Sequence, residues 1–140
     1  MLGPVLVSAA FGFLKGFLSR GEPRGFDARM DFFGPVKEEL VYRGAPLWAL
    51  PGLPFGTTAV AFAADHVMSD NRNSPMTTRE MVARFGDVLL GGCLYEMAFR
   101  ESGIFGAVAS HMAHNMACGW GSRARGPLPC GEVAPPPVQT

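Results

Sequence analysis

The distribution of charge constrains this chain more than any other feature of its sequence. The stretch from Gly44 to Ala64 carries no charge. It follows directly on three charged side chains, those of Glu38, Glu39 and Arg43. On a helix, Glu39 and Arg43 are four positions apart, so they share a face and can form an ion pair. Glu38 is rotated by about 100° from Glu39 and points away from that pair. The spacing predicts one carboxylate held by arginine and one available for chemistry, although a charged helix start at a membrane edge or protein surface would have the same pattern.

The composition favours a single domain of membrane helices. Apolar residues make up 48% of the 140 residues and charged residues 17%, below the roughly 25% charged that is typical of soluble domains. Glycine and proline contribute 18 and 12 residues, a content that membrane helices tolerate. Twelve basic side chains balance twelve acidic ones, which removes nucleic acid as an obvious partner. Three cysteines without CxxC spacing argue against a disulfide framework.

Apolar segments separated by polar or Gly/Pro-rich breaks predict an all-α fold, a polytopic membrane helical bundle of about five helices. Pro35 suits the first turn of the second helix, and Pro51 and Pro54 end it. We expect helices at 1–19, 35–50, 56–68, 78–99 and 102–122, with a polar loop at 21–34 and further breaks at 69–75 and 100–101. The predicted organisation is an N-terminal membrane helix and cytoplasmic loop (1–34), a core (35–122) and a disordered proline-rich tail (123–140).

Loop charges predict how these helices would cross a membrane. The loops at 19–37 and 69–84 and the tail hold most of the arginine and lysine, whereas the loops at 51–55 and 100–102 hold only Arg100. Because basic loops stay in the cytoplasm, we expect an integral, multi-pass protein of the bacterial cytoplasmic membrane, with its N-terminus outside and its C-terminus in the cytoplasm. The first segment could instead be a cleaved signal peptide, but its positive charges follow the apolar run rather than precede it. A soluble five-helix domain is the remaining alternative.

Four polar side chains, His66, His111, His114 and Asn115, lie in or at the ends of apolar segments. Each could be a hydrogen-bonded packing residue, but ionisable groups inside a membrane are costly and are functional by default. The predicted topology brings His66, His111 and Asn115 to the same depth as Glu38. His111 and Asn115 are four apart and share a face, whereas His114 is rotated by about 60° from His111. A carboxylate with His66 could take a proton from water, and His111 with Asn115 could donate hydrogen bonds to the oxyanion that forms when water attacks a carbonyl.

Three motifs resemble those of the CPBP family, the CAAX-protease and bacteriocin-processing (Abi) glutamic intramembrane proteases. Glu38-Glu39-Leu-Val-Tyr-Arg43 is similar to EExxxR, Phe62-Ala-Ala-Asp-His66 to FxxxH, and His111-Met-Ala-His-Asn115 to HxxxN. The stretch from Gly91-Gly92-Cys-Leu-Tyr95 to Gly103-Ile104-Phe105 also looks like the family's segment before its last helix, so the resemblance covers about 35–119. It implies a membrane endopeptidase in which Glu38 and His66 activate water, His111 and Asn115 form the oxyanion site, and Glu39 and Arg43 support them. Helix spacing by itself leaves open which of the two glutamates is the base.

The chain departs from the family in one respect. Only one predicted membrane helix, 1–19, precedes the first motif, where family members usually have several. A minimal enzyme, a fragment and a reduced relative would each fit, and the intact motifs favour a minimal enzyme with a reduced version of the CPBP fold. Sorting-signal substrates of the myxosortase kind are one option. We expect neither a cofactor nor a metal. The expected substrate is a membrane protein or peptide, and the protein should contact the lipid bilayer. Association into an oligomer is a further option.

Two other functions fit the same residues. A zinc-dependent membrane hydrolase could use His66, His111, His114 and a glutamate as ligands, although the chain has no HExxH motif. A non-catalytic membrane immunity or scaffold protein could keep the motifs as a packed polar network. Such a network lowers stability when it is only partly satisfied, so intact motifs argue against the second alternative.

Overall fold

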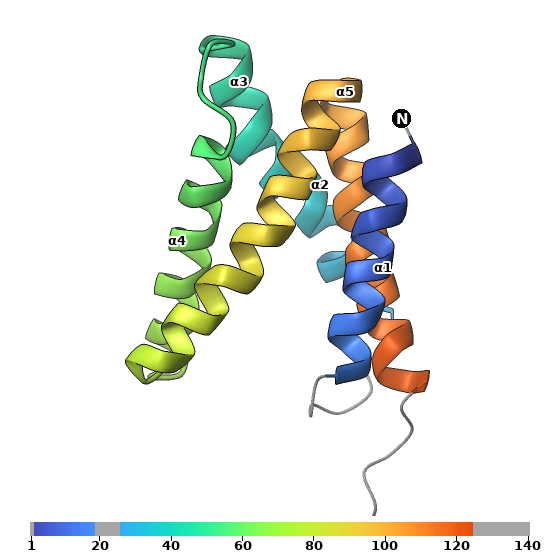
Figure 1. Cartoon of the computed structure of the whole chain (residues 1–140), viewed down its shortest axis with the longest axis vertical. Coiled ribbons are helices and arrows are strands. Elements are labelled where there is room, and N and C mark those ends of the chain that lie inside the picture. Colours follow the sequence, from blue (N-terminus) through green and yellow to red (C-terminus); the bar gives the residue numbers. More distant parts are fainter. Residues whose placement is uncertain (1, 19–25, 125–140) are drawn as a thin grey trace, which may run out of the picture.

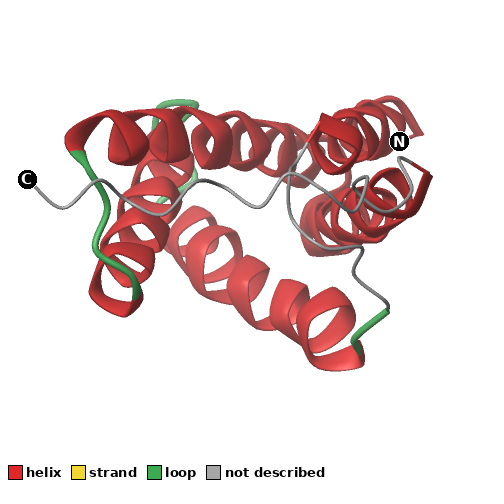
Figure 2. Ribbon diagram, turned by 90° about the horizontal axis from the view of Figure 1, so that it is seen from below, coloured by secondary structure: helices red, strands yellow, loops and turns green. Residues whose placement is uncertain are grey.

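The computed structural model describes residues 2–18 and 26–124, and these ranges are helical apart from short connections (Figures 1 and 2). No strand occurs in the described ranges, so the all-α prediction is confirmed for them. Two of the segments, labelled η, are π-helical. In chain order the elements are α1 (Leu2–Leu18), η1 (Arg29–Phe33), α2 (Gly34–Glu39), η2 (Leu40–Gly44), α3 (Ala45–Ala49), α4 (Thr57–Asn73) and α5 (Thr78–Ala124).

The helix of the first motif begins earlier than the sequence predicts. Arg29 starts a helical stretch that runs through η1, α2, η2 and α3 to Ala49, so residues 29–34 are not the polar loop that was expected. The amide of Arg29 donates to Oδ1 of Asp27 at 2.8 Å, and the amide of Asp27 donates to Oδ2 of Asp31 at 2.8 Å. These two aspartates satisfy free amides of the first turn. The helix can therefore begin before Pro35.

Helix α4 also extends further than predicted. The polar run after Met68 was expected to end it, but the helix continues to Asn73. Oδ2 of Asp70 accepts a hydrogen bond from Nε of Arg84 at 2.7 Å, so a partner on α5 stabilises this last turn.

Helix α5 contains both the predicted fourth and fifth helices. Its first half (yellow) and second half (orange) run in opposite directions in Figure 1. The helical dihedral angles are interrupted at Gly103, with φ 65° and ψ −160°, a conformation that glycine adopts readily. The break was expected at Arg100 and Glu101, but Nη2 of Arg100 forms an ion pair with Oε1 of Glu96 at 2.8 Å. That i,i+4 pair keeps Arg100 within the helix.

Helix α1 packs closely against the second half of α5 (Figure 1). Gly12 and Gly16 make the close approach possible, because a Cβ at either position would clash with the backbone carbonyl of His114 or Cys118. One turn before Gly12, Oγ of Ser8 lies 2.6 Å from Oγ of Ser110. Small residues and a hydroxyl pair at a helix interface are typical of helices packed in membranes.

None of the described helices combines the length and the apolar character that a membrane crossing requires. The polytopic arrangement therefore stays a prediction, as do the three proposed regions of the chain. Residues 123 and 124 belong to α5, and the rest of the expected disordered tail, 125–140, lies outside the described residues, as do Met1 and residues 19–25.

Candidate active site

A buried carboxylate, Glu39, lies at the centre of the polar interior. Its side chain is fully buried, and Oε1 accepts hydrogen bonds from Nη1 of Arg43 at 3.2 Å and from Nδ1 of His111 at 2.8 Å. The predicted i,i+4 pair of Glu39 with Arg43 is thus confirmed. Glu39 connects the first motif with the third across 72 residues of sequence.

Arg43 is equally buried and is held from several sides. Its Nη2 donates to the backbone carbonyl of Gly92 at 3.1 Å. Its guanidinium carbon lies 4.4 Å from the ring centroid of Phe62 and 5.6 Å from that of Tyr95. Cation–π contacts of this kind stabilise a desolvated guanidinium. A side chain so enclosed can balance the charge of Glu39, but it does not line the cavity that Glu38 and His66 share.

Glu38 faces the other way, as the helix spacing predicts, and its carboxylate meets two histidines. Oε2 of Glu38 lies 3.7 Å from Nε2 of His66 and 3.7 Å from Nε2 of His111. The Glu38 side chain is 32% exposed, whereas that of Glu39 is fully buried. Of the two adjacent glutamates, Glu38 is therefore the one that can reach a solvent molecule or a ligand.

The second ring nitrogen of each histidine is tied to an acceptor. Nδ1 of His66 lies 2.9 Å from the backbone carbonyl of Phe62, and Nδ1 of His111 lies 2.8 Å from the carboxylate of Glu39. Carbonyl and carboxylate oxygens only accept hydrogen bonds, so both Nδ1 atoms carry the proton. In the neutral rings both Nε2 atoms then present a lone pair towards Glu38.

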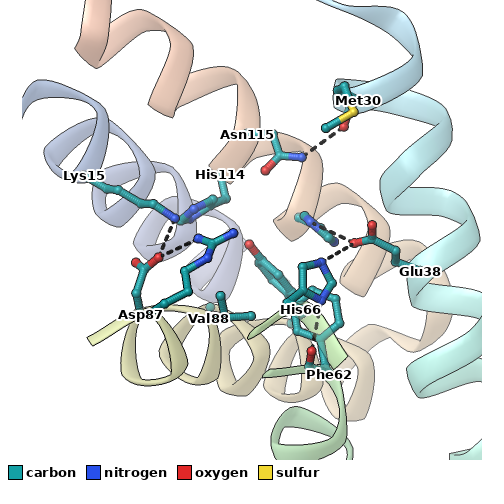
Figure 3. A pocket seen from close by; sticks show the side chains of 13 residues that line it. Lys15, Met30, Glu38, Phe62, His66, Asp87, Val88, His114 and Asn115 are labelled. Atoms are coloured by element: carbon teal, nitrogen blue, oxygen red, sulfur yellow. Dashed lines mark hydrogen bonds and ion pairs between the residues drawn. The ribbon is translucent and has the colours of Figure 1, made fainter. Parts of the chain in front are cut away.

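These groups line a cavity of about 190 Å³ (Figure 3). Four of the six predicted site residues line it, namely Glu38, His66, His111 and Asn115, while Glu39 and Arg43 lie behind its wall. Nδ2 of Asn115 donates to the backbone carbonyl of Met30 at 3.2 Å. Because an amide NH₂ has two hydrogens, one remains for a ligand. His66 and Glu38 face each other at one side of the cavity in Figure 3, and Asn115 lies above them.

His114 also lines the cavity, at a distance from the Glu38 group. In Figure 3 it lies beside Lys15 and Asp87, opposite Glu38 and His66. Its ring centroid is 5.2 Å from that of Phe11 on α1. The 60° rotation from His111 thus brings His114 towards α1, although the ring of Tyr95 lies near both histidines, 4.2 Å from His111 and 6.0 Å from His114.

Sequence reasoning did not assign Lys15, Asp87 and Tyr95 to the site, although all three line the same cavity. Lys15 on α1 pairs with Oδ2 of Asp87 at 2.7 Å, and Tyr95 stacks on His111, with ring centroids 4.2 Å apart and 12° between the planes. Lys15 could have been noticed, because it is the one charged residue among 2–18. Tyr95 lies in a stretch that resembles the family, but its ring gives no chemical signal by itself.

The part of the chain that the structure describes contains no candidate metal centre. No group of three or more histidine, cysteine, aspartate or glutamate side chains among residues 2–18 and 26–124 is arranged to hold a metal ion. Two members of the ligand set considered for zinc, His66 and His114, lie on opposite sides of the cavity in Figure 3.

Comparison with known proteins identifies the family. No curated protein sequence and no solved structure matches the chain. The family model described as type II CAAX prenyl endopeptidase Rce1-like matches residues 28–117, which is more than half of the chain and includes all three motifs. Members of that family are membrane proteins. The chain therefore belongs to the Rce1-like family of type II CAAX prenyl endopeptidases.

Proposed function

We propose that this protein is an intramembrane endopeptidase that hydrolyses a peptide bond of a membrane-associated protein or peptide with water activated by Glu38 and His66. The observation that carries the proposal is the convergence of two imidazole Nε2 atoms, from His66 and His111, on the carboxylate of Glu38. All three groups line one cavity. Carboxylate and imidazole are the side chains that most often transfer protons in hydrolysis.

In the proposed mechanism, Glu38 and His66 activate the water molecule. A water molecule beside Oε2 of Glu38 would give its proton to that carboxylate while its oxygen attacks the carbonyl carbon of the substrate. His66, with its proton fixed on Nδ1 by the carbonyl of Phe62, offers the Nε2 lone pair to the same water. The proton then passes to the nitrogen of the leaving amine as the carbon–nitrogen bond breaks.

Glu39 is not available for this role. Its carboxylate is fully buried and holds Arg43 and His111. A base must lie within hydrogen-bond reach of the proton that it removes, and the exposed fraction of Glu38 favours that residue. We assign Glu39 and Arg43 to support.

His111 and Asn115 are the proposed oxyanion donors. The free hydrogen of the Asn115 amide can point into the cavity. His111 can donate through Nε2 only when both of its ring nitrogens carry a proton. The ring lies between two carboxylates, Glu39 at Nδ1 and Glu38 at Nε2, so an acceptor lies within 4 Å of each ring nitrogen.

The surface supports a membrane location. Large apolar side chains are exposed on several helices, among them Phe105 at 86% and Leu2 at 70%. The exposed large apolar residues of α1 are Leu2, Leu6, Val7, Phe13, Leu14, Phe17 and Leu18. Soluble monomers rarely expose apolar surface on this scale. We propose contact with the lipid bilayer, a multi-pass topology with the C-terminus in the cytoplasm, and association into oligomers as an option.

The proposal can be tested with the protein expressed in bacterial membranes. Wild type, Glu38→Gln and His66→Ala would be compared on three membrane-anchored peptides: one prenylated with a CAAX end, one with the same unmodified end, and one with a sorting signal. Glu80→Gln, an exposed glutamate outside the cavity, is the matched control. We expect cleavage by wild type and the control that resists a chelator and falls at least about 100-fold in both site variants.

Two other outcomes would redirect the assignment. Loss of cleavage with chelator, restored by zinc, would point to a metalloenzyme. Retention of the protein's cellular phenotype by Glu38→Gln would point to a non-catalytic role.

A further inference from the structure

We infer that Tyr95 is a positioning residue that fixes the plane of the His111 ring, so that its Nε2 faces Glu38. The inference rests on the proposed endopeptidase function for its role in catalysis, but the geometry can be tested separately. Tyr95 lies outside the three motifs, on the first half of α5, whereas His111 lies on the second half.

The contact between the two rings is close and nearly parallel. Their centroids are 4.2 Å apart and their planes differ by 12°. Tyr95 is 3% exposed, so solvent does not compete for the face of the ring. Its own orientation is set by an edge contact with Phe62, at 6.2 Å and 79°. Offset stacking and edge contacts are the geometries that aromatic pairs prefer.

Stacking supplies a restraint that the hydrogen bond of His111 does not. The bond from Nδ1 to Glu39, at 2.8 Å, restrains one edge of the ring, but a carboxylate oxygen accepts over a broad range of angles, so the ring can still tilt through χ1 and χ2. Such a tilt would move Nε2 relative to Glu38, which is 3.7 Å away. A parallel ring on one face opposes this tilt. Glu39 and Tyr95 together therefore determine where Nε2 points.

The sequence around Tyr95 is adapted to this position. Gly91 precedes it by one turn, and a Cβ at Gly91 would lie 3.3 Å from the phenol oxygen of Tyr95. The next residue, Gly92, offers its carbonyl to Arg43. The paired glycines thus make room for the phenol on one side and for the arginine on the other.

The experiment distinguishes the effect of the Tyr95 ring from the effect of its hydroxyl group. Tyr95→Phe keeps the stacked ring, whereas Tyr95→Leu and Tyr95→Met remove it; the flexible methionine fills the space if leucine prevents folding. Phe99→Leu is the matched control, because Phe99 lies on the same helix but its ring faces Trp48, at 6.2 Å. All variants would be prepared in detergent micelles with ¹⁵N-labelled histidine.

The primary measurement is the NMR spectrum of the imidazole groups. The chain has three histidines, so the His111 signals can be assigned with a His111→Gln variant. We expect a protected Nδ1 proton, hydrogen-bonded to Glu39, in wild type, Tyr95→Phe and Phe99→Leu. That proton signal should broaden or disappear in Tyr95→Leu and Tyr95→Met.

Kinetics supply the second measurement. A misplaced catalytic group costs turnover, so kcat should fall roughly 10- to 100-fold in the ring-free variants, with KM within about threefold because the lining of the cavity is otherwise unchanged. Tyr95→Phe should stay within about threefold of wild type.

An unchanged His111 signal in a folded ring-free variant would overturn the inference, as would equal loss of the signal in Phe99→Leu. A defect in Tyr95→Phe as large as in Tyr95→Leu would also overturn it, because the hydroxyl would then be responsible. If wild type cleaved nothing while the NMR differences appeared, the proposed function would fail and the positioning of His111 would stand.

Discussion

Nδ1 of His111 lies 2.8 Å from Oε1 of Glu39, and this contact joins the third motif to the first inside the protein. The same carboxylate oxygen accepts a hydrogen bond from Arg43. The adjacent Glu38 lies near the other nitrogen of the same ring, with Oε2 3.7 Å from Nε2 of His111, and lines the cavity. The two neighbouring carboxylates thus lie in different surroundings, one in the interior and one at the cavity.

Glu39→Gln should destabilise the protein more than Glu38→Gln does. The first change leaves the buried charge of Arg43 without its partner, and breaking a buried ion pair in this way costs about 3–5 kcal/mol. The second change removes a partly exposed carboxylate and should alter the free energy of unfolding by less than about 1 kcal/mol, although the proposed function predicts that it abolishes cleavage. Thermal unfolding in detergent would compare the two variants. Equal stability of both would contradict the buried pairing.

Gly12→Ala should loosen the contact of α1 with α5. A methyl group at this position would meet the backbone carbonyl of His114, which cannot rotate away, and overpacking of this kind costs about 1–3 kcal/mol. Gly86→Ala is the control, because nothing lies within 4 Å of a Cβ there and the exchange should stabilise its helix by up to about 1 kcal/mol. The prediction fails if Gly12→Ala unfolds at the same temperature as wild type.

Lys15→Met should change stability little. The ion pair of Lys15 with Asp87 is short, at 2.7 Å, but its side chains are 32% and 26% exposed, and such pairs contribute about 0–1 kcal/mol. A double-mutant cycle with Asp87→Asn would measure the interaction directly. A coupling above about 2 kcal/mol would show that the pair is far less hydrated than its exposure indicates.

Glu96→Ala should lower the stability of the protein and increase the mobility of residues 50–56, which connect α3 with α4. Its fully buried carboxylate accepts hydrogen bonds from the amide of Gly56 at 3.1 Å, from Oγ1 of Thr58 at 2.6 Å and from Arg100. Buried donors left unpaired cost about 1–3 kcal/mol each, so we expect a loss of at least about 2 kcal/mol. Thr58→Val removes one of these donors and should cost about 1 kcal/mol. Faster limited proteolysis between residues 50 and 56 in Glu96→Ala, and not in Thr58→Val, would locate the effect.

The helical spacing within each motif was predictable from the sequence. Residues four apart share a helix face whatever the surroundings, and for this reason the pair of Glu39 with Arg43 and the divergence of Glu38 could be expected. The three motifs were also sufficient to indicate the family that the match over 28–117 identifies. Boundaries were less predictable, because Asp27, Asp31 and Asp70 stabilise helical turns that the polar composition had assigned to loops.

Only the tertiary structure decided which partners these faces meet. The break at Gly103 folds the second half of α5 back, and this reversal brings His111 within reach of both glutamates and beneath Tyr95. The close packing of α1 brings Lys15 into the cavity. Periodicity is a property of one helix, whereas the rotation and tilt of one helix against another depend on side-chain packing between distant segments. The sequence therefore determined which side chains are candidates for the site. The packing determined the acceptor of each imidazole proton and which of the two glutamates faces the cavity.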